Sequence, residues 1–412
     1  MFDSASAKSA SGRRGIIRRA IDRLLPRLVG DGGLTLRYPD GSETEAGNGP
    51  GLLVEIKTWR AARRILLDPG LNFGEAFMDG TLVPLDCTVF DVLDMLLAAR
   101  RREGLGPIND LREAIARAAK RINQFNPASR ARRNVAHHYD LGLDFYRLLL
   151  DDDLQYSCAY FASGAETLAQ AQAAKKQHIA KKLLLDRPGL RVLDIGCGWG
   201  GMALTLARDY DADVTGITLS QEQLQTARAR AEQAGLSHRV RFELLDYRAV
   251  PLTFDRIVSV GMFEHVGINH YAQYFEVVNR CLEPGGVALI HSIGRSYGPN
   301  ATNPWLQRYI FPGGYSPALS EVMPAVEKSG LITTDIEILR LHYAKTLACW
   351  RENLERYRDE IVGLYDERFA RMFEFYLSGA ELGFRHSGYM IWQLQLARQH
   401  GAVPLTRDYI SQ

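Results

Sequence analysis

Five short apolar runs in the second half of the chain constrain its fold most strongly. Each has the length of a buried strand, and each is separated from the next by a turn or a helix-length segment; they occupy residues 191–198, 212–219, 239–246, 254–261 and 286–294. Alternation of this kind predicts an α/β fold with a parallel, doubly wound sheet. Ligands of such sheets bind beyond the carboxyl ends of the strands, so we expect the functional residues just after these runs.

The first run ends in a glycine-rich turn, DIGCGWGG, over residues 194–201. Glycines let a ligand approach the backbone, and the next helix start supplies free N–H groups. The turn also satisfies the dinucleotide pattern G-x-G-x-x-G, which expects an acid about 20 residues on, at the end of the second strand. Thr218 holds that place, which disfavours a nicotinamide-dependent dehydrogenase. The structural alternative is a glycine turn that only packs helix on sheet.

Three features together resemble the class I S-adenosylmethionine-dependent methyltransferases. They are the acid before the first glycine, the E/D-x-G-x-G-x-G motif, and Asp246-Tyr247 after the third run. The resemblance implies a Rossmann-like sheet whose glycine loop faces the amino-acid end of the cofactor, with the ribose at the second strand and adenine beside the third. Because Thr218 departs from the usual acid, the ribose contact would fall to Gln223 or to the Thr218 hydroxyl.

Further motifs are scattered along the chain but follow one order. They are GEAFMDG (74–80), HYD (138–140), YSCAYF (156–161), GMFEHVG (261–267), HSIG (291–294) and LHYAKTL (341–347). From about residue 30 to the end, the sequence resembles the cyclopropane-fatty-acyl-phospholipid synthase family, which includes the mycolic acid synthases. The resemblance implies methylene transfer from S-adenosylmethionine to the cis double bond of an unsaturated phospholipid acyl chain, which forms a cyclopropane ring.

The resemblance also implies a site. A bound bicarbonate ion would accept the proton, held by Cys158, Glu264, His291, Tyr343 and the Ile293 backbone, and no metal is implied. Cofactor contacts would come from Tyr156, Ser157, Asp194, Gly196, Gly198, Gly200, Thr218, Gln223, Asp246 and Tyr247. Four of these candidates have a plain structural alternative: Cys158 as a small buried hydrophobic residue, Glu264 as a helix cap, His291 as a core histidine and Tyr343 as a support for a strand. We expect His265 and Lys345 to be structural neighbours.

One position departs from the family. Many relatives carry a cysteine where this chain has Ala380, so no covalent cysteine mechanism can be placed there. The five cysteines are odd in number and form no C-x-x-C pair, which argues against a zinc cage or a disulfide framework and for a reducing compartment.

Charge is distributed unevenly. The whole chain of 412 residues has a net charge of only +2, which argues against a nucleic-acid-binding protein. Residues 1–27 hold seven basic and two acidic side chains, and residues 100–133 hold ten and three. Neither a secretion signal nor a membrane-spanning run is present in this sequence. We therefore expect a cytoplasmic enzyme bound peripherally to the anionic inner face of the membrane.

The length suggests two or three domains. We expect a smaller lipid-binding domain over residues 1–99, a basic helical linker over 100–133, and the catalytic domain, with helical additions, over 134–412. In the first domain we expect strands at 34–38 and 52–56 and helices at 59–67 and 89–98. Relatives suggest a homodimer.

An amphipathic helix is expected over residues 11–30, ended or kinked by Pro26. Its apolar face would carry Ile16, Ile17, Ala20, Ile21 and Leu24, and its basic face Arg18, Arg19 and Arg23. The helix would lie on anionic lipid, although a terminal helix packed on its own domain is the alternative.

The acyl chain is expected to pass an aromatic segment at 297–317, for which a core-capping loop is the alternative. A late helix would close the other side, with Phe373, Phe375, Tyr376, Leu377, Phe384 and Trp392. Two other functions stay open. One is a related C-methyltransferase that gives a methyl or methylene branch, and the other is a non-catalytic lipid-binding protein.

Overall fold

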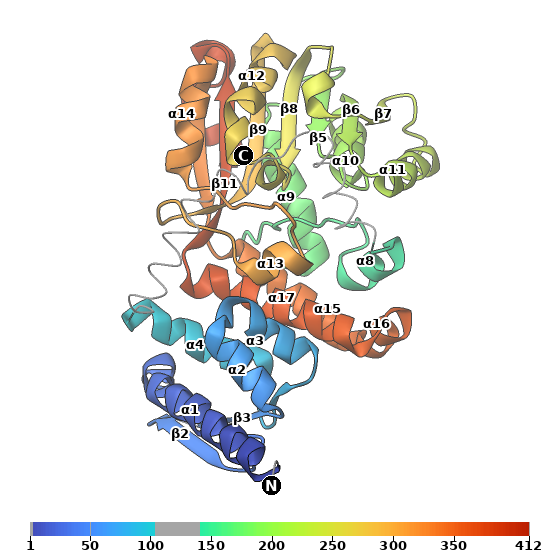
Figure 1. The fold of residues 1–412 in the computed structure, drawn as a ribbon. Coiled ribbons are helices and arrows are strands. Elements are labelled where there is room, and N and C mark those ends of the chain that lie inside the picture. Colours follow the sequence, from blue (N-terminus) through green and yellow to red (C-terminus); the bar gives the residue numbers. More distant parts are fainter. Residues whose placement is uncertain (1–2, 50, 104–140, 412) are drawn as a thin grey trace. The chain divides into compact units, whose positions relative to one another are not determined.

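The structure is a computed structural model that describes residues 3–49, 51–103 and 141–411 (Figure 1). The chain divides into two compact units. The first takes in the described residues up to 103 together with 303–310 and 351–387, and the second takes in 141–302, 311–350 and 388–411. The His138–Asp140 motif and most of the expected linker lie outside the described residues, so the domain boundaries at 99 and 133 stay predictions.

The first unit combines a four-stranded sheet with helices. Its strand order is β2-β1-β3-β4, with β1 parallel to β3 and the other pairs antiparallel. The expected strands and the two expected helices are confirmed. The elements are α1 (Asp3–Val29), β1 (Gly33–Arg37), β2 (Glu43–Gly47), β3 (Gly51–Ile56), α2 (Trp59–Leu67), α3 (Pro69–Met78), β4 (Leu82–Pro84), α4 (Val89–Glu103), α13 (Pro304–Tyr309), α16 (Arg358–Leu364) and α17 (Glu367–His386).

Helix α1 corrects two expectations. It does not end at Pro26 but continues to Val29, and the Pro26 carbonyl accepts a hydrogen bond from Gly30 N at 3.2 Å. Its packed face is also rotated: Ile17, Ile21, Leu25 and Val29 join the core of the unit, whereas Ile16 is 60% and Leu24 43% exposed. Arg18 lies on the packed side and donates to Ser42 Oγ at 2.9 Å.

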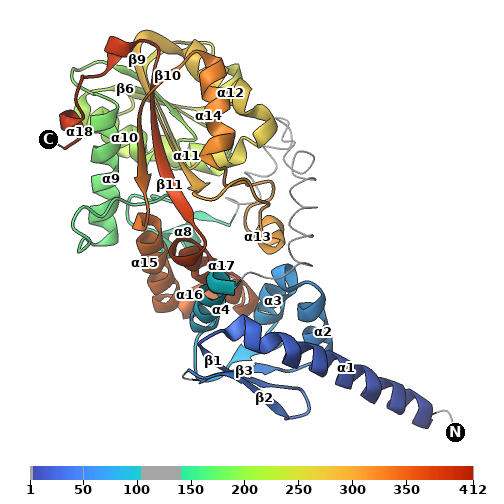
Figure 2. The same cartoon turned by 90° about the vertical axis from the view of Figure 1, so that its left-hand side faces the viewer.

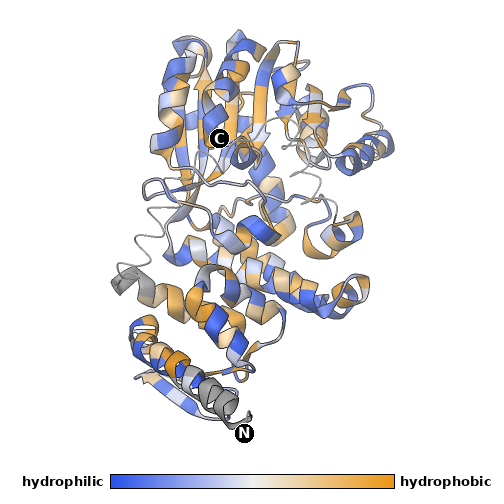
Figure 3. Ribbon diagram, in the orientation of Figure 1, coloured by the Kyte–Doolittle hydropathy of each residue, from blue (hydrophilic) through white to orange (hydrophobic). Residues whose placement is uncertain are grey.

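The second unit is built on a seven-stranded sheet of order β10-β11-β9-β8-β5-β6-β7. The five predicted strands are confirmed as β5 to β9 and are parallel; β11 and β10 extend the sheet antiparallel beyond β9. In the second unit, α9, α10 and α11 cover one face of the sheet and α12 and α14 the other (Figure 2). Figure 3 shows that its central strands are strongly apolar, as burial on both faces requires.

The bounds of the second unit's elements are as follows: α8 (Leu143–Leu149), α9 (Leu168–Lys182), β5 (Arg191–Ile195), α10 (Gly201–Tyr210), β6 (Asp213–Thr218), α11 (Gln221–Gln233), β7 (Val240–Leu244), η1 (Tyr247–Ala249), β8 (Phe254–Val260), η2 (Phe263–His265), η3 (Ile268–His270), α12 (Tyr271–Cys281), β9 (Leu282–Arg295), α14 (Leu319–Ser329), β10 (Ile332–Leu339), β11 (Tyr389–Ala397), η4 (His400–Ala402) and α18 (Asp408–Ser411). Helix α15 (His342–Arg356) crosses from the second unit to the first at residue 351.

Two late elements differ from expectation. Tyr343 lies at the start of α15 and so supports no strand, because the apolar positions 343, 344, 347, 350 and 354 follow the helical period and are buried. Trp392 belongs to β11 and not to the late helix, which ends at His386. Gly388, with a φ of +67°, separates the two.

Candidate active site

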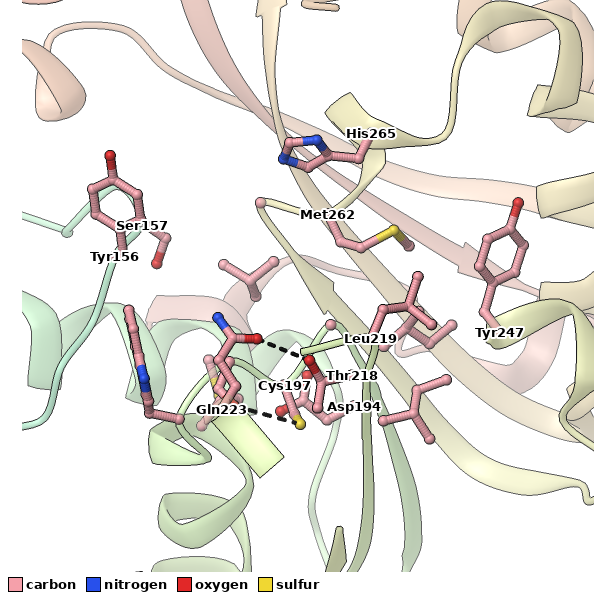
Figure 4. Close-up of a pocket in the computed structure, with 18 of the residues that line it drawn as sticks. Tyr156, Ser157, Asp194, Cys197, Thr218, Leu219, Gln223, Tyr247, Met262 and His265 are labelled. Atoms are coloured by element: carbon pink, nitrogen blue, oxygen red, sulfur yellow. Dashed lines mark hydrogen bonds between the residues drawn. The ribbon is translucent and has the colours of Figure 1, made fainter. Parts of the chain in front are cut away.

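A pocket lies at the carboxyl ends of the parallel strands, where the sequence predicted it (Figure 4). The loops after β5, β6, β7 and β8 supply most of its wall, and residues 154–157 supply the rest. Every predicted cofactor contact except Gly200 lines it: Tyr156, Ser157, Asp194, Gly196, Gly198, Thr218, Gln223, Asp246 and Tyr247.

The glycines of the 194–201 loop differ in what surrounds them. A Cβ on Gly196, whose φ is +83°, would stand 2.8 Å from Met262 Cβ, so only glycine fits there. A Cβ on Gly198 would meet nothing within 4 Å, which leaves open space at the pocket wall. Gly200 instead faces the core, since its Cβ would stand 2.7 Å from Phe242 Cζ. Contact between Gly200 and the cofactor stays a prediction.

The end of β6 carries a hydroxyl and an amide in place of the usual acid. Thr218 Oγ1 donates to Gln223 Oε1 at 2.8 Å and accepts from Ser220 N at 3.1 Å. This fixes the Gln223 carbonyl toward Thr218 and leaves the amide nitrogen as a donor at the pocket (Figure 4). Both side chains are buried, so the pair can hold a ribose hydroxyl by hydrogen bonds without a carboxylate.

Two acids in the pocket are held differently. Asp246 accepts two hydrogen bonds from Arg248, at 2.8 and 2.6 Å, and this fork fixes its side chain. Asp194 is 2% exposed, and its Oδ2 has no hydrogen-bond partner among the residues described. Burial raises the pKa of Asp194 to about 7. An unsatisfied buried carboxyl oxygen beside a glycine loop fits a ligand that brings hydrogen-bond donors.

The elements that carry Cys158 and Tyr343 are joined. Ala159 N donates to Thr346 Oγ1, and Phe161 N donates to His342 Nδ1, both at 3.0 Å. These bonds fasten the YSCAYF segment to the first turns of α15. Trp350 of α15 packs on both tyrosines: its ring centroid lies 5.1 Å from that of Tyr156 and 5.8 Å from that of Tyr343. Cys158 is fully buried, and burial raises the pKa of its thiol, so it stays protonated at neutral pH.

The other three catalytic candidates lie along η2 and β9. Ile293 N donates to Glu264 Oε1 at 2.6 Å, so this backbone donor, expected to hold bicarbonate, is engaged by Glu264. His291 Nδ1 lies 3.2 Å from Gln393 Nε2. Burial raises the pKa of Glu264 to about 7 and lowers that of His291 to about 3. Glu264 is therefore partly protonated and His291 neutral near pH 7.

Glu264 Oε2 and His291 Nε2 are buried without a hydrogen-bond partner in the described part of the chain. Leaving such atoms without a partner costs about 1–3 kcal/mol each, a cost that a hydrogen-bonding ligand beside them would remove. None of the five catalytic candidates lines the pocket itself. Their roles stay predictions.

Sequence reasoning missed several residues of the site. Gln155, Met262, His265 and Arg248 line the pocket; His265 was expected to be only a structural neighbour, and burial lowers its pKa to about 4. All four residues lie within or directly beside the motifs YSCAYF, GMFEHVG and Asp246-Tyr247, so their positions in the sequence could have indicated them. Lys175 was also missed: it is fully buried behind the wall and donates to Gln155 and Ser157.

The described residues contain no group of three or more His, Cys, Asp or Glu side chains suited to a metal ion. No helix among them has the length and apolar character needed to span a bilayer.

Comparisons with known proteins identify the family of this chain. Residues 127–394 match the family model described as mycolic acid cyclopropane synthetase. The chain is 40% identical over 349 residues to the cyclopropane-fatty-acyl-phospholipid synthase of Escherichia coli (strain K12), covering 84% of this chain and 87% of that protein. It is 36% identical over 420 residues to tuberculostearic acid methyltransferase UfaA1 of Mycobacterium tuberculosis, covering 96% and 92%.

A solved structure agrees as well. The mycolic acid cyclopropane synthase CmaA1, complexed with S-adenosylhomocysteine (SAH) and CTAB, superposes with a TM-score of 0.61 at 32% identity, covering 66% of this chain and 99% of that one. The chain therefore belongs to the mycolic acid cyclopropane synthetase family and is an enzyme with the fold of S-adenosylmethionine-dependent methyltransferases.

Proposed function

We propose that this enzyme transfers a methylene group from S-adenosylmethionine to the cis double bond of an unsaturated acyl chain in a membrane phospholipid, forming a cyclopropane ring. The observation that carries the proposal is the pocket at the strand ends, lined by the glycine loop and the Thr218–Gln223 pair. The relatives' names supply the substrate class.

The cofactor supplies an electrophilic methyl group on a sulfonium. Around it, this chain's residues bind and orient. Gln223 would hold the ribose, Asp194 would accept hydrogen bonds from the amino-acid end, and Tyr247, beside β7, would flank the adenine. An alkene is a weak nucleophile, so holding it in line with the methyl in a dry site is the main rate advantage that such a protein can give.

After the alkene attacks, the new methyl group must lose a proton for the ring to close. We propose that bicarbonate is the acceptor and that Cys158, Glu264, His291, Tyr343 and the Ile293 region hold it. The protonated Cys158 thiol, which donates to Ala159 O at 3.3 Å in the structure, would turn to donate to the anion. Glu264 Oε2 and His291 Nε2, which have no hydrogen-bond partner among the described residues, would bond to it as well. Ile293 N already donates to Glu264 Oε1. This backbone group would therefore orient the Glu264 carboxyl group and not bind bicarbonate directly.

The test is direct. Incubation with S-adenosylmethionine and unsaturated phospholipid vesicles, followed by mass spectrometry of the fatty acids, should show a gain of CH₂ with loss of the double bond. Glu264→Gln keeps the shape and the acceptor for Ile293 N but removes the titratable oxygen, and it should lower turnover by about 10²-fold or more. Full activity of this variant at saturating bicarbonate would refute the proton-transfer role.

A second product is favoured by one observation. The relative named tuberculostearic acid methyltransferase aligns with 96% of this chain, which supports a C-methyltransferase that leaves a methyl or methylene branch. In the same assay a retained double bond, or a branched chain, identifies this outcome. SAH binding without any product would instead count against unsaturated phospholipid as the substrate.

We also propose that the enzyme acts as a peripheral protein on the cytoplasmic, anionic face of the membrane, through α1. Four arginines of α1 are exposed: Arg14, Arg19, Arg23 and Arg27. Beside them along the helix lie three exposed apolar residues, Ile16, Leu24 and Leu28, which are 60%, 43% and 38% exposed. Arginines attract anionic headgroups at about 1 kcal/mol each, and the apolar side chains can enter the interface.

Vesicle binding tests this surface. Gln at positions 19, 23 and 27 together should weaken binding to anionic vesicles by about 100-fold, since roughly 1 kcal/mol is lost per arginine. Arg37→Gln, on β1 and paired with Glu43, is the matched control. Binding that is unchanged by the triple substitution, or by high salt, would refute this docking mode.

We also propose that the enzyme is a homodimer, which sedimentation velocity tests.

A further inference from the structure

One buried lysine stands behind the pocket wall. Lys175 of α9 has no exposed surface, yet no carboxylate lies within ion-pair distance of its ammonium among the described residues. Its Nζ donates to Gln155 Oε1 at 2.6 Å and to Ser157 Oγ at 2.8 Å. Burying an ammonium against two neutral acceptors costs folding free energy, which suggests a gain elsewhere.

The acceptors of Lys175 belong to the segment that forms the pocket wall. Residues 154–157 all line the pocket. The segment is held tightly: Leu154 takes a φ of +57°, a strained value for a side-chain-bearing residue, and Gln172, one turn before Lys175, donates to the carbonyls of Gln155 and Ser157. Helix α9 thus fixes both the backbone and the side chains of the wall.

The direction of these bonds sets what the wall offers to a ligand. Lysine only donates, so Ser157 Oγ and Gln155 Oε1 must accept from it. The Ser157 hydrogen is then left to donate elsewhere, and the Gln155 amide nitrogen, which donates to Asp153 Oδ2 at 2.9 Å, is held in one orientation. A wall that presents donors suits a ligand group with acceptors only, such as a carboxylate.

We propose that Lys175 is a positioning residue for the cofactor: it turns Ser157 and Gln155 into hydrogen-bond donors for the carboxylate of the bound S-adenosyl ligand. The inference rests on the proposed cofactor pocket. Burial lowers the pKa of Lys175 to about 8, opposed by Asp151 and Asp153, while Lys176 lowers it further and Cys158 raises it. The ammonium also lowers the pKa values of Asp194 and His291. Lysine in its uncharged form can also accept, so the donor pattern is secure below that pKa.

Two probes separate this role from mere support of the fold. SAH carries the amino-acid carboxylate, whereas 5′-methylthioadenosine shares its adenosine and thioether but lacks the amino acid. Calorimetric titration of each into Lys175→Met should show about tenfold weaker SAH binding, equal to about 1.4 kcal/mol, with 5′-methylthioadenosine binding unchanged within about twofold. Lys181→Met is the control: Lys181 lies on the same helix, its side chain has no hydrogen-bond or ion-pair partner within the described part of the chain, and the change should leave both affinities unchanged.

A double-mutant cycle adds a second readout. Ser157→Ala should weaken SAH binding in the wild type but much less in the Lys175→Met background, because the hydroxyl is no longer oriented. Equal weakening of both probes, unchanged SAH affinity, or additive effects would overturn the inference. If Lys175→Met does not fold, Ser157→Ala alone must still weaken SAH selectively, and equal effects on both probes would overturn the inference. A wild-type protein that binds neither probe would instead refute the proposed function.

Discussion

Alanine at two glycines of one loop, Gly198 and Gly200, should change ligand affinity and stability to different extents. Gly198 lines the pocket with a φ of +54°, and a Cβ there would meet nothing within 4 Å. The left-handed backbone costs a non-glycine residue about 1–2 kcal/mol. At about 2–4 °C per kcal/mol for a unit of this size, Gly198→Ala should lower Tm by about 4 °C. Its methyl group would occupy ligand space, so we expect SAH to bind about tenfold more weakly.

The Gly200→Ala variant should be less stable than the wild type. The φ of Gly200 is +87°, and a Cβ would stand 2.7 Å from Phe242 Cζ and 3.1 Å from Ala227 Cβ. Overpacking costs about 1–3 kcal/mol in addition to the backbone strain, so Gly200→Ala should lose about 3–4 kcal/mol and about 10 °C in Tm. SAH affinity should change little once the protein is folded, because the added methyl group faces the core.

The control isolates the backbone strain. Gly189 is exposed and outside the pocket, has a φ of +72°, and a Cβ there would meet nothing within 4 Å. Thermal unfolding and calorimetric SAH titration of the three alanine variants then separate strain, packing and ligand space. If Gly198→Ala matches Gly189→Ala in both Tm and SAH affinity, the space at Gly198 is not ligand space, and the reasoning fails.

Three more outcomes are expected. Glu264 has its pKa raised to about 7 by burial, so the unfolded chain ionises first as pH rises and stability is lost between about pH 4.5 and 7; Glu264→Gln should therefore gain up to about 3 kcal/mol over wild type above pH 7 in urea unfolding, with no gain at pH 4. Thr218→Val should weaken SAH and 5′-methylthioadenosine equally in calorimetry, because the oriented Gln223 amide serves the ribose that both share; selective loss of SAH would count against this. Alkylation of the native protein at pH 7.5, followed by peptide mass spectrometry, should leave the buried thiols unmodified, and rapid labelling of any of them would contradict their burial: Cys158, Cys197 and Cys281.

The parts of this fold that could be predicted are those with a clear local sequence pattern. Strands β5 to β9 are apolar runs because both faces are covered, and the glycine loop is recognisable because Gly196 has no alternative residue at its φ. Strand β11 was missed for the opposite reason. Gln393 and Gln395 interrupt its apolar pattern, although both are fully buried and hydrogen-bonded to partners far along the chain, Gln395 Nε2 to Lys182 O at 2.6 Å.

Other predictions failed because a sequence alone does not show which side of a helix packs against the rest of the protein. Helix α1 has apolar residues around much of its circumference, so which stripe packs is decided by the sheet beneath it. Lys175 shows the same limit: a lysine in a helix is normally solvated, and only the wall segment at 154–157, brought against it by tertiary structure, reveals that it is buried.

Burial is the common cause behind the chemistry that we propose. A thiolate beside a sulfonium would be methylated, and burial keeps the Cys158 thiol protonated; the same absence of water lowers the pKa of His291 to about 3 and leaves a neutral imidazole. Water would also capture a carbocation before the ring closes. One physical property, dryness, therefore suppresses both side reactions. It also raises the pKa of Glu264 to about 7, so turnover that depends on the Glu264 carboxylate should rise as pH passes from 6 to 8, and a flat profile over that range would show that its ionisation does not matter.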